Sequence, residues 1–178
     1  MKTILSAACF VVLSSTAMGG WAQSAGPTDP QIAAIVVTAN QVDIDAGELA
    51  KSKAQSKEVK RFAQLMITDH SGVNQSAVAL VHKLKVTPEN SATSDSLKKG
   101  GDDNMANLKK LKGAAFDRAY VDHEVAYHEA VIDALDKTLI PNAKNEELKA
   151  LLVKVRPAFV AHLDHAKQLQ SSLGKSGG

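Results

Sequence analysis

The chain has 178 residues, of which 44% are hydrophobic and 22% charged, so it is long enough to form one domain with a sizeable core. Its formal net charge is only +2, and neither a long basic run nor an aromatic–basic platform occurs, so the sequence does not support nucleic-acid binding. Aromatic residues make up 4%, while alanine, leucine, lysine and valine are abundant, which favours packed helices over a β-sandwich.

The first 22 residues have the pattern of a signal peptide. Lys2 supplies the positive start, residues 4–12 form an apolar core, and Gly20 and Ala22 place small residues before the expected cleavage point. The apolar stretch is too short and too rich in serine for a membrane anchor, and nothing in the mature chain is apolar for long enough to span a bilayer. We therefore expect cleavage near Ala22 and, for a bacterial source, a periplasmic or secreted protein.

A first pair of helices is expected over residues 30–54 and 57–85, after a flexible lead at 23–29. The sequence Thr28-Asp29-Pro30-Gln31 is typical of a helix start, with a capping residue, proline in the first turn and glutamine three residues after threonine. Inward positions then recur every three or four residues, which is the spacing of one buried helical face. These positions are Ile32, Val36, Ala39, Asp43, Ala46 and Ala50 in the first helix, and Val59, Ala63, Met66, His70, Val73, Ala77, Leu80 and Leu84 in the second.

A second pair of helices is expected over residues 114–139 and 145–173, followed by a disordered tail at 174–178. Asn145 is a suitable cap for the last helix. Pro157 lies inside that helix, where we expect a kink or a local break. The inward positions are Val121, Val125, His128, Ile132, Leu135 and Leu139 in the third helix, and Leu148, Leu152, Val155, Phe159, His162, Ala166, Leu169 and Leu173 in the fourth.

The two pairs are joined by a less regular crossover, residues 86–113, which is rich in serine, threonine, asparagine and aspartate. We expect it to contain a short helix from 102 to 111, after the pair Gly100-Gly101. Four helices of about 25–29 residues with two tight turns and one long crossover predict an all-α, ferritin-like antiparallel four-helix bundle over residues 30–173.

Each inward face carries one residue that does not belong in an apolar seam: Asp43, His70, His128 and His162. Burying a charge or an unpaired imidazole costs several kcal/mol, so each of these side chains needs a partner. A single inward histidine is usually satisfied by a carbonyl or a carboxylate in the core. Three histidines on three helices, with an acid on the fourth, favour either a shared ligand or a hydrogen-bonded polar layer.

The heights of these residues along the helices agree better in the first pair than in the second. Asp43 lies about 11 residues before the first turn and His70 about 13 after it, which places them within about 3 Å in height. His128 is about 11 residues from the end of its helix and His162 about 17 from the start of its own, a mismatch of about 9 Å. A break at Pro157, or a longer third helix, would have to absorb this difference.

If the four residues meet, their imidazole and carboxylate ligands suit one Zn, Cu, Fe or Ni ion, whereas Ca or Mg would require more oxygen ligands. Asp69 and Glu124 lie beside the inward faces, where they could accept hydrogen bonds from the histidines and fix their tautomers. His165 follows His162 by one turn and is an alternate for the same role. The single cysteine, Cys9, lies in the expected signal peptide, which leaves the mature chain without a thiolate ligand.

Three blocks of residues, together with Leu49-Ala50, form a combined motif that covers about residues 30–172. The blocks are Val59-Lys60, Phe62-Ala63, Met66, Asp69-His70 and Asn74; Gly113, Phe116-Asp117, Tyr120 and His128; and Pro157, His162-Leu163 and Ala166. In this motif the chain resembles the domain of unknown function 4142 family (DUF4142), a family of secreted bacterial proteins in the ferritin-like superfamily. The resemblance implies an exported helical bundle but no particular activity, because the family lacks a settled one.

The same resemblance places Asp43 where the family usually has a glutamate. Ferritin-like di-iron enzymes need a Glu-x-x-His motif on two helices and two further glutamates. The sequence contains no Glu-x-x-His, so a di-iron oxidase or an iron-storage role is disfavoured.

Two functions of different kinds follow from these observations. The first is a periplasmic metal-binding bundle that serves sequestration, delivery or stress protection, with the four inward polar residues as ligands. The second is a non-catalytic structural or interaction module with a buried polar layer and no metal, for which an envelope protein is a candidate partner. Catalysis is favoured least, because the sequence has no GxSxG motif, no phosphate-binding glycine loop and no nucleophilic cysteine in the expected mature chain.

Overall fold

The computed structural model describes residues 26–175, and the regular structure within that range is entirely helical, which confirms the prediction of an all-α chain. The expected signal peptide at 1–22 and the last three residues, 176–178, lie outside the described residues. The last helix continues two residues beyond its predicted end at 173. The elements, in chain order, are α1 (Asp29–Lys53), α2 (Lys57–Leu84), α3 (Ala92–Lys110), α4 (Gly113–Ala134), the π-helix η1 (Leu135–Leu139), α5 (Ile140–Asn142) and α6 (Glu146–Lys175).

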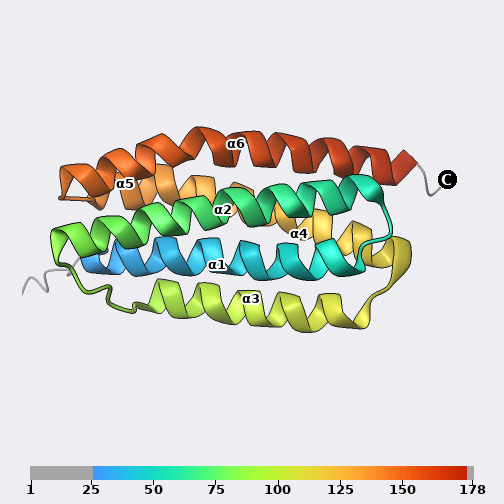
Figure 1. Ribbon diagram of the computed structural model, residues 1–178, viewed down its shortest axis with the longest axis horizontal. Coiled ribbons are helices and arrows are strands. Elements are labelled where there is room, and N and C mark those ends of the chain that lie inside the picture. The colour runs from blue at the N-terminus through green and yellow to red at the C-terminus, as the bar shows by residue number, and fades with distance from the viewer. Residues whose placement is uncertain (1–25, 176–178) are drawn as a thin grey trace, which may run out of the picture.

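The long helices lie side by side along one axis (Figure 1). α1 packs against both α2 and α3, while α6 packs against both α2 and α4. The colours of Figure 1 show that α1, α3 and α6 run in one direction and that α2 and α4 run in the other. In the same view α3 lies on the side of α1 that faces away from α6, so α3 covers the outside of the packed helices.

Side-chain caps fix where three of the long helices begin. Thr28 and Gln31 form a capping box at the start of α1, and Ser56 accepts hydrogen bonds from two amides at the start of α2. At the start of α6, Asn145 Oδ1 accepts hydrogen bonds from the amides two and three residues later. These caps satisfy amides that the first helical turn leaves unpaired, so they set the ends of the helices and the length of the turns.

Two aspartates tie the turns to distant helices. Asp117 in α4 accepts hydrogen bonds from two consecutive amides in the turn between α1 and α2, those of Gln55 at 2.9 Å and Ser56 at 2.7 Å. Asp29, at the start of α1, accepts hydrogen bonds at 2.8 and 2.9 Å from the last two amides before α6. One carboxylate therefore holds each turn, so the pair α1–α2 is joined to the pair α4–α6 at both ends of the molecule.

A polar layer divides the hydrophobic core into two clusters. In α1, Ile32 and Val36 belong to one cluster, Ala46 and Ala50 belong to the other, and Asp43 lies between them. In α2, in α4 with η1, and in α6, a buried histidine likewise lies between residues of the two clusters. We define the polar layer as the buried residues Asn40, Asp43, His70, Glu124, His128 and His162.

The crossover differs from its predicted form, because the expected short helix at 102–111 is part of a longer helix that begins at Ala92. Ser91 and Ser94 form a capping box at this start. A serine capping box of this kind is hard to recognise in a segment that is rich in serine throughout. The crossover is therefore mostly helical and adds a fifth long helix to the four that were expected.

Two glycines inside α3 do not break it, and one of them allows close packing. Gly101 is buried against α1, where an added Cβ would lie 2.7 Å from Val42 Cγ2. Gly100 is exposed, and an added Cβ would meet nothing within 4 Å. The absence of a side chain at Gly101 therefore permits the close approach of α3 to α1.

Of the kink or local break that we expected at Pro157, the break does not occur, because the last long helix is continuous through this residue. Pro157 is exposed, where water can satisfy the carbonyl that proline leaves unpaired. The difference in height is absorbed instead by α4, which runs on through η1 and α5 to Asn142. His128 lies 14 residues before Asn142 and His162 lies 16 residues after Glu146, so their heights differ by only about 3 Å.

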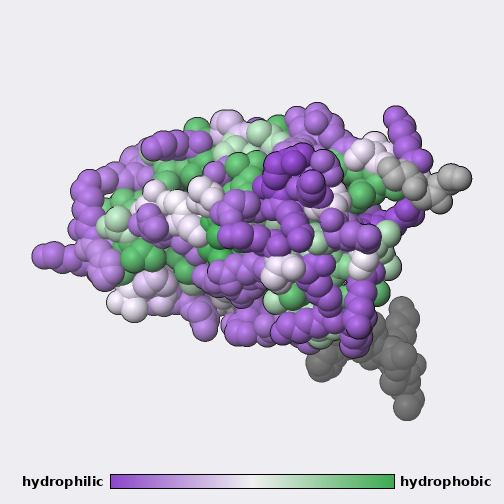
Figure 2. Space-filling view, turned by 45° about the vertical axis from the view of Figure 1, so that its right-hand side comes forward, coloured by the Kyte–Doolittle hydropathy of each residue, from purple (hydrophilic) through white to green (hydrophobic). Residues whose placement is uncertain are grey.

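The surface seen in Figure 2 is mostly hydrophilic, with smaller hydrophobic areas between the polar side chains. Among the described residues, the large hydrophobic side chains that are exposed are Leu65, Val78 and Val153. Isolated exposed hydrophobic residues of this kind are usual on protein surfaces and do not by themselves mark an interface. Between residues 26 and 175, no helix combines the length and the apolar character that crossing a membrane requires.

The two neighbouring glycines of α3 give a direct test of this packing. We expect Gly101→Ala to lower the free energy of unfolding by about 1–3 kcal/mol, because the new methyl group would push Val42 and separate α3 from α1. Gly100→Ala is the matched control and should raise stability by up to about 1 kcal/mol, because alanine is the better helix former. Urea unfolding of both variants measures the difference. Equal stabilities would contradict the close approach of the two helices.

Candidate metal centre

The polar layer brings together side chains from four helices. Asp43 comes from α1, His70 from α2, His128 from α4 and His162 from α6, and none is more than 3% exposed. The ring centroids of the three histidines are 5.2–5.6 Å apart. Each ring offers one nitrogen that lies within 4.8 Å of the nitrogens offered by the other two. Small side-chain movements would therefore allow one ion to reach all three imidazoles.

His70 is held through one nitrogen by Asn40. The Asn40 amide nitrogen donates a hydrogen bond to the Val36 carbonyl oxygen at 2.7 Å, so its Oδ1 faces the imidazole. His70 Nδ1 lies 2.7 Å from this Oδ1 and therefore carries the proton and donates it. This hydrogen bond assigns the tautomer of His70 and leaves a lone pair on Nε2.

The other two imidazoles are held in the same manner by different acceptors. His128 Nδ1 lies 3.0 Å from the backbone carbonyl oxygen of Glu124, one turn earlier in α4. His162 Nε2 lies 2.9 Å from the Asp69 carboxylate of α2. Both acceptors require a protonated ring nitrogen, so the lone pair remains on Nε2 of His128 and on Nδ1 of His162.

The nitrogens that carry these lone pairs have no hydrogen-bond partner among the described residues. Burial, together with the neighbouring imidazoles of His128 and His162, lowers the pKa of His70 to about 2. Burial likewise lowers the pKa of His128 to about 4, and it lowers that of His162 despite the nearby Asp69 carboxylate. All three rings are therefore neutral near pH 7, which is the form in which imidazole binds a metal ion.

Two buried carboxyl groups lie on the other side of His128. Asp43, Glu124 and His128 each offer a ligand atom within 4.8 Å of the other two. Asp43 Oδ1 and both oxygens of Glu124 have no hydrogen-bond partner within residues 26–175, and Asp43 Oδ2 lies 3.4 Å from His70 Nε2. The buried hydroxyl of Tyr120 lies one turn before Glu124 and neighbours its carboxyl group.

Burial raises the pKa of both carboxyl groups. The pKa of Asp43 is raised to about 7, although the neighbouring Glu124 carboxyl partly opposes this shift. The pKa of Glu124 is raised by burial and further by the negative charge of Asp43. A bound cation would favour the ionised form of both groups, because it would supply the positive charge that the surrounding helices do not.

The structure places the sequence-predicted residues as follows. The four predicted ligands meet in the polar layer, and Asp69 accepts a hydrogen bond from the last of them, His162. Glu124 lies deeper than its predicted position beside the inward face, because it is 0% exposed and joins the layer itself. His165 does not join the layer, since its ring packs edge to face on Phe62 with centroids 5.0 Å apart.

Three residues of this region were not predicted from the sequence to belong to the site. Asn40 is three residues before Asp43 and so shares its helical face, which is the signal that would have identified it. Phe159 stacks on His70, with ring centroids 5.1 Å apart. The Tyr120 side chain neighbours the Glu124 carboxyl group. Both aromatic residues also lie three or four positions from a polar-layer residue on the same helix, but aromatic residues at that spacing are common in any helical core.

The fold and the site together define an all-helical protein with a buried histidine–carboxylate layer. Residues 15–169 match the model of the family described as domain of unknown function (DUF4142), and because this match spans most of the chain, the protein belongs to that family. The resemblance to this family that was seen in the sequence is thereby confirmed. Comparison with curated proteins and with solved structures gives no match.

Replacing the buried acid of α1 should change how stability depends on pH. Folding raises the pKa of Asp43 to about 7 from the ordinary value of 3.8, so the contribution of this one carboxyl group to stability falls as the pH rises between these values. In metal-free protein, we expect the stability of Asp43→Asn relative to wild type to rise by several kcal/mol from pH 4 to pH 7 and then to level off. Urea unfolding at a series of pH values measures it. A constant difference across the range would contradict a buried, uncharged carboxyl group.

Proposed function

We propose that this protein is an exported, ferritin-like four-helix bundle that binds one transition-metal ion in the bacterial envelope. Export is supported by the signal-peptide pattern of the first 22 residues. The bundle architecture is supported by two antiparallel helix pairs, α1 with α2 and α4 with α6, which are joined by the long crossover that contains α3.

One observation carries the metal-binding proposal. Three buried, neutral imidazoles each use one nitrogen for a fixed acceptor and leave the other nitrogen without a partner among the described residues. Metal-binding histidines in proteins are typically held in this way, with the non-ligating nitrogen donating to a carbonyl or a carboxylate. The proposed ligands are His70, His128 and His162, completed by Asp43.

The kind of ion follows from the ligand set. Three imidazoles with one carboxylate suit Zn, Cu, Fe or Ni, whereas Ca and Mg prefer sites made mostly of oxygen ligands. Glu124 lies close enough to Asp43 to serve as a further carboxylate ligand or to accept a hydrogen bond from it. The layer is closed to solvent, which suits sequestration or delivery of an ion better than turnover of a substrate.

A second function is favoured by a different observation. The hydrogen bonds that His70 donates to Asn40 and His162 donates to Asp69 each join two helices, so the polar layer could fix helix register without any ion. The protein would then be a structural or interaction module of the envelope, with another envelope protein as its partner.

Elemental analysis of the purified protein distinguishes the two functions. We expect close to one Zn, Cu, Fe or Ni ion per chain, and a melting temperature that falls when a chelator removes it. The double variant His70→Ala/His162→Ala should lose the ion. The matched control is His82→Ala, which removes an exposed histidine of the same helix as His70 and should retain the ion.

Circular dichroism of each variant shows whether it remains helical, so that loss of metal can be separated from loss of fold. Retention of a stoichiometric ion by the folded double variant would contradict the ligand assignment. Metal-free protein whose melting temperature is unchanged by all four ions would support the register function instead.

The residue that holds His70 should matter for affinity although it binds no metal itself. Asn40→Leu removes the acceptor for His70 Nδ1, so we expect the ion to bind about 10–100-fold more weakly. Competition with a chromophoric chelator measures this affinity. Asn90→Leu is the control, because Asn90 is an exposed asparagine in the connection between α2 and α3. An equal loss in both variants would show that His70 is not positioned by Asn40.

A further inference from the structure

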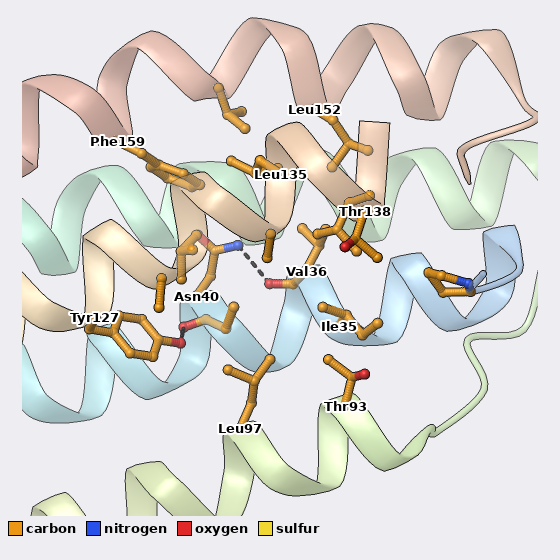
Figure 3. A pocket seen from close by; sticks show the side chains of 17 residues that line it. Ile35, Val36, Asn40, Thr93, Leu97, Tyr127, Leu135, Thr138, Leu152 and Phe159 are labelled. Carbon is orange, nitrogen blue, oxygen red and sulfur yellow. Dashed lines mark hydrogen bonds between the residues drawn. The ribbon is translucent and has the colours of Figure 1, made fainter. Parts of the chain in front are cut away.

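An apolar cavity of about 260 Å³ lies beside the polar layer, between α1, α3, α4 with η1, and α6 (Figure 3). Its walls are aliphatic for most of their area and include Ile35 of α1, Leu97 of α3 and Leu152 of α6. Phe159 and Asn40, which contact His70, form the end of the cavity nearest to the polar layer. The cavity therefore ends at residues that hold the candidate metal site, but no metal-ligand candidate lines it.

The polar atoms around the cavity are already paired or lie at its edge. The Tyr127 hydroxyl donates a hydrogen bond to the Ala39 carbonyl oxygen at 3.0 Å, and the Asn40 amide is used by its two partners in the protein. Thr93 and Thr138 are exposed residues. No lysine, arginine, aspartate, glutamate or histidine lines the cavity within the described part of the chain. A molecule in this cavity would meet neither a charge nor a buried hydrogen-bonding group without a partner.

The π-helix provides a second, independent observation. η1 interrupts the α-helical pattern between α4 and α5, and three of its five residues, Leu135, Thr138 and Leu139, line the cavity. Single-turn π-helices are rare and occur frequently at functional sites. The irregular segment of this helical run is therefore the one that forms a wall of the cavity.

The volume limits what the cavity can hold. An apolar cavity of about 150 Å³ lined by leucine, isoleucine and phenylalanine can bind benzene. The present cavity is larger and accommodates a molecule of about ten carbon atoms, while a helix or strand of a partner protein would not fit.

We propose that this cavity binds a small, neutral, apolar molecule of about the size of naphthalene. The bound molecule lies against Phe159 and Asn40 and is therefore in contact with the side chains that position His70. The proposal does not require a metal ion, because the walls of the cavity contain none of the metal-ligand candidates. A failure of metal binding would leave it intact.

The test is a titration of purified, chelator-treated protein with naphthalene, followed by the NMR signals of isoleucine, leucine and valine methyl groups. We expect saturable shifts at methyl groups that line the cavity, such as those of Ile35, Leu97 and Leu152, and no shifts at Val59 and Leu108 in the other core cluster. Naphthalene-2-sulfonate is the matched probe with a charge, and it should bind at least tenfold more weakly.

Two variants of α4 complete the test. Ala134→Leu fills the cavity and should weaken naphthalene binding at least tenfold, whereas Ala126→Leu, on the exposed side of the same helix, should bind as the wild type does. If Ala134→Leu does not fold, Leu97→Trp fills the cavity from α3 instead. The proposal is overturned if wild-type protein shows no saturable shifts at the lining methyl groups, if the sulfonate binds equally well, or if a folded, filled variant binds naphthalene as tightly as wild type.

Discussion

Burial of polar groups from four helices at one level is the constraint on which the rest of this structure depends. Three imidazoles and two carboxyl groups cannot leave water without partners. Each imidazole has one fixed acceptor, which is a side-chain amide, a backbone carbonyl or a carboxylate. The opposite nitrogens and three carboxyl oxygens have no such partner within residues 26–175, so the interior retains ligand atoms that an ion or water must satisfy. The same layer lies between the two hydrophobic clusters along the helix axes.

Much of this arrangement could be predicted, because the helical periodicity of the sequence indicates which side chains face the core. Asp43 and His70 each continue an apolar repeat of three and four residues, and a residue in such a repeat must face the core. Periodicity does not report which nitrogen of an imidazole is free, since that depends on acceptors such as Asn40 and the Glu124 carbonyl oxygen. It also placed Glu124 beside the inward face, whereas packing of the neighbouring helices buries that carboxyl group completely.

The positions of the polar side chains along the helix axes were less predictable than the faces on which they lie, because they depend on where particular helices end. A rise of 1.5 Å per residue converts any error in a helix end into an error in level. The third long helix was expected to stop near 139, but its continuation through η1 and α5 brings His128 and His162 to similar heights. A π-helix of five residues leaves no clear mark in a hydrophobic repeat, and Pro157 suggested a break that an exposed position makes unnecessary. The first half of the crossover helix, before the expected start at 102, was missed because its composition is that of a loop.

Two side chains connect the polar layer to the apolar cavity. Asn40 holds His70 and lines the cavity, and Phe159 stacks on His70 and forms the adjoining wall. A molecule in the cavity and an ion in the layer would therefore act on the same pair of residues from opposite sides. Any energetic coupling between them would be reciprocal, so that each would change the affinity of the other by the same factor.

The two aspartates that hold the turns limit how the chain could change in length. Asp117 and Asp29 each bind two consecutive amides, so one added residue in either turn would move an amide away from its carboxylate and shift the following helix around its axis. A rotation of about 100° per residue would carry an inward histidine out of the core. Insertions are therefore best tolerated between α2 and α3, at residues 85–91, because α3 carries no residue of the polar layer.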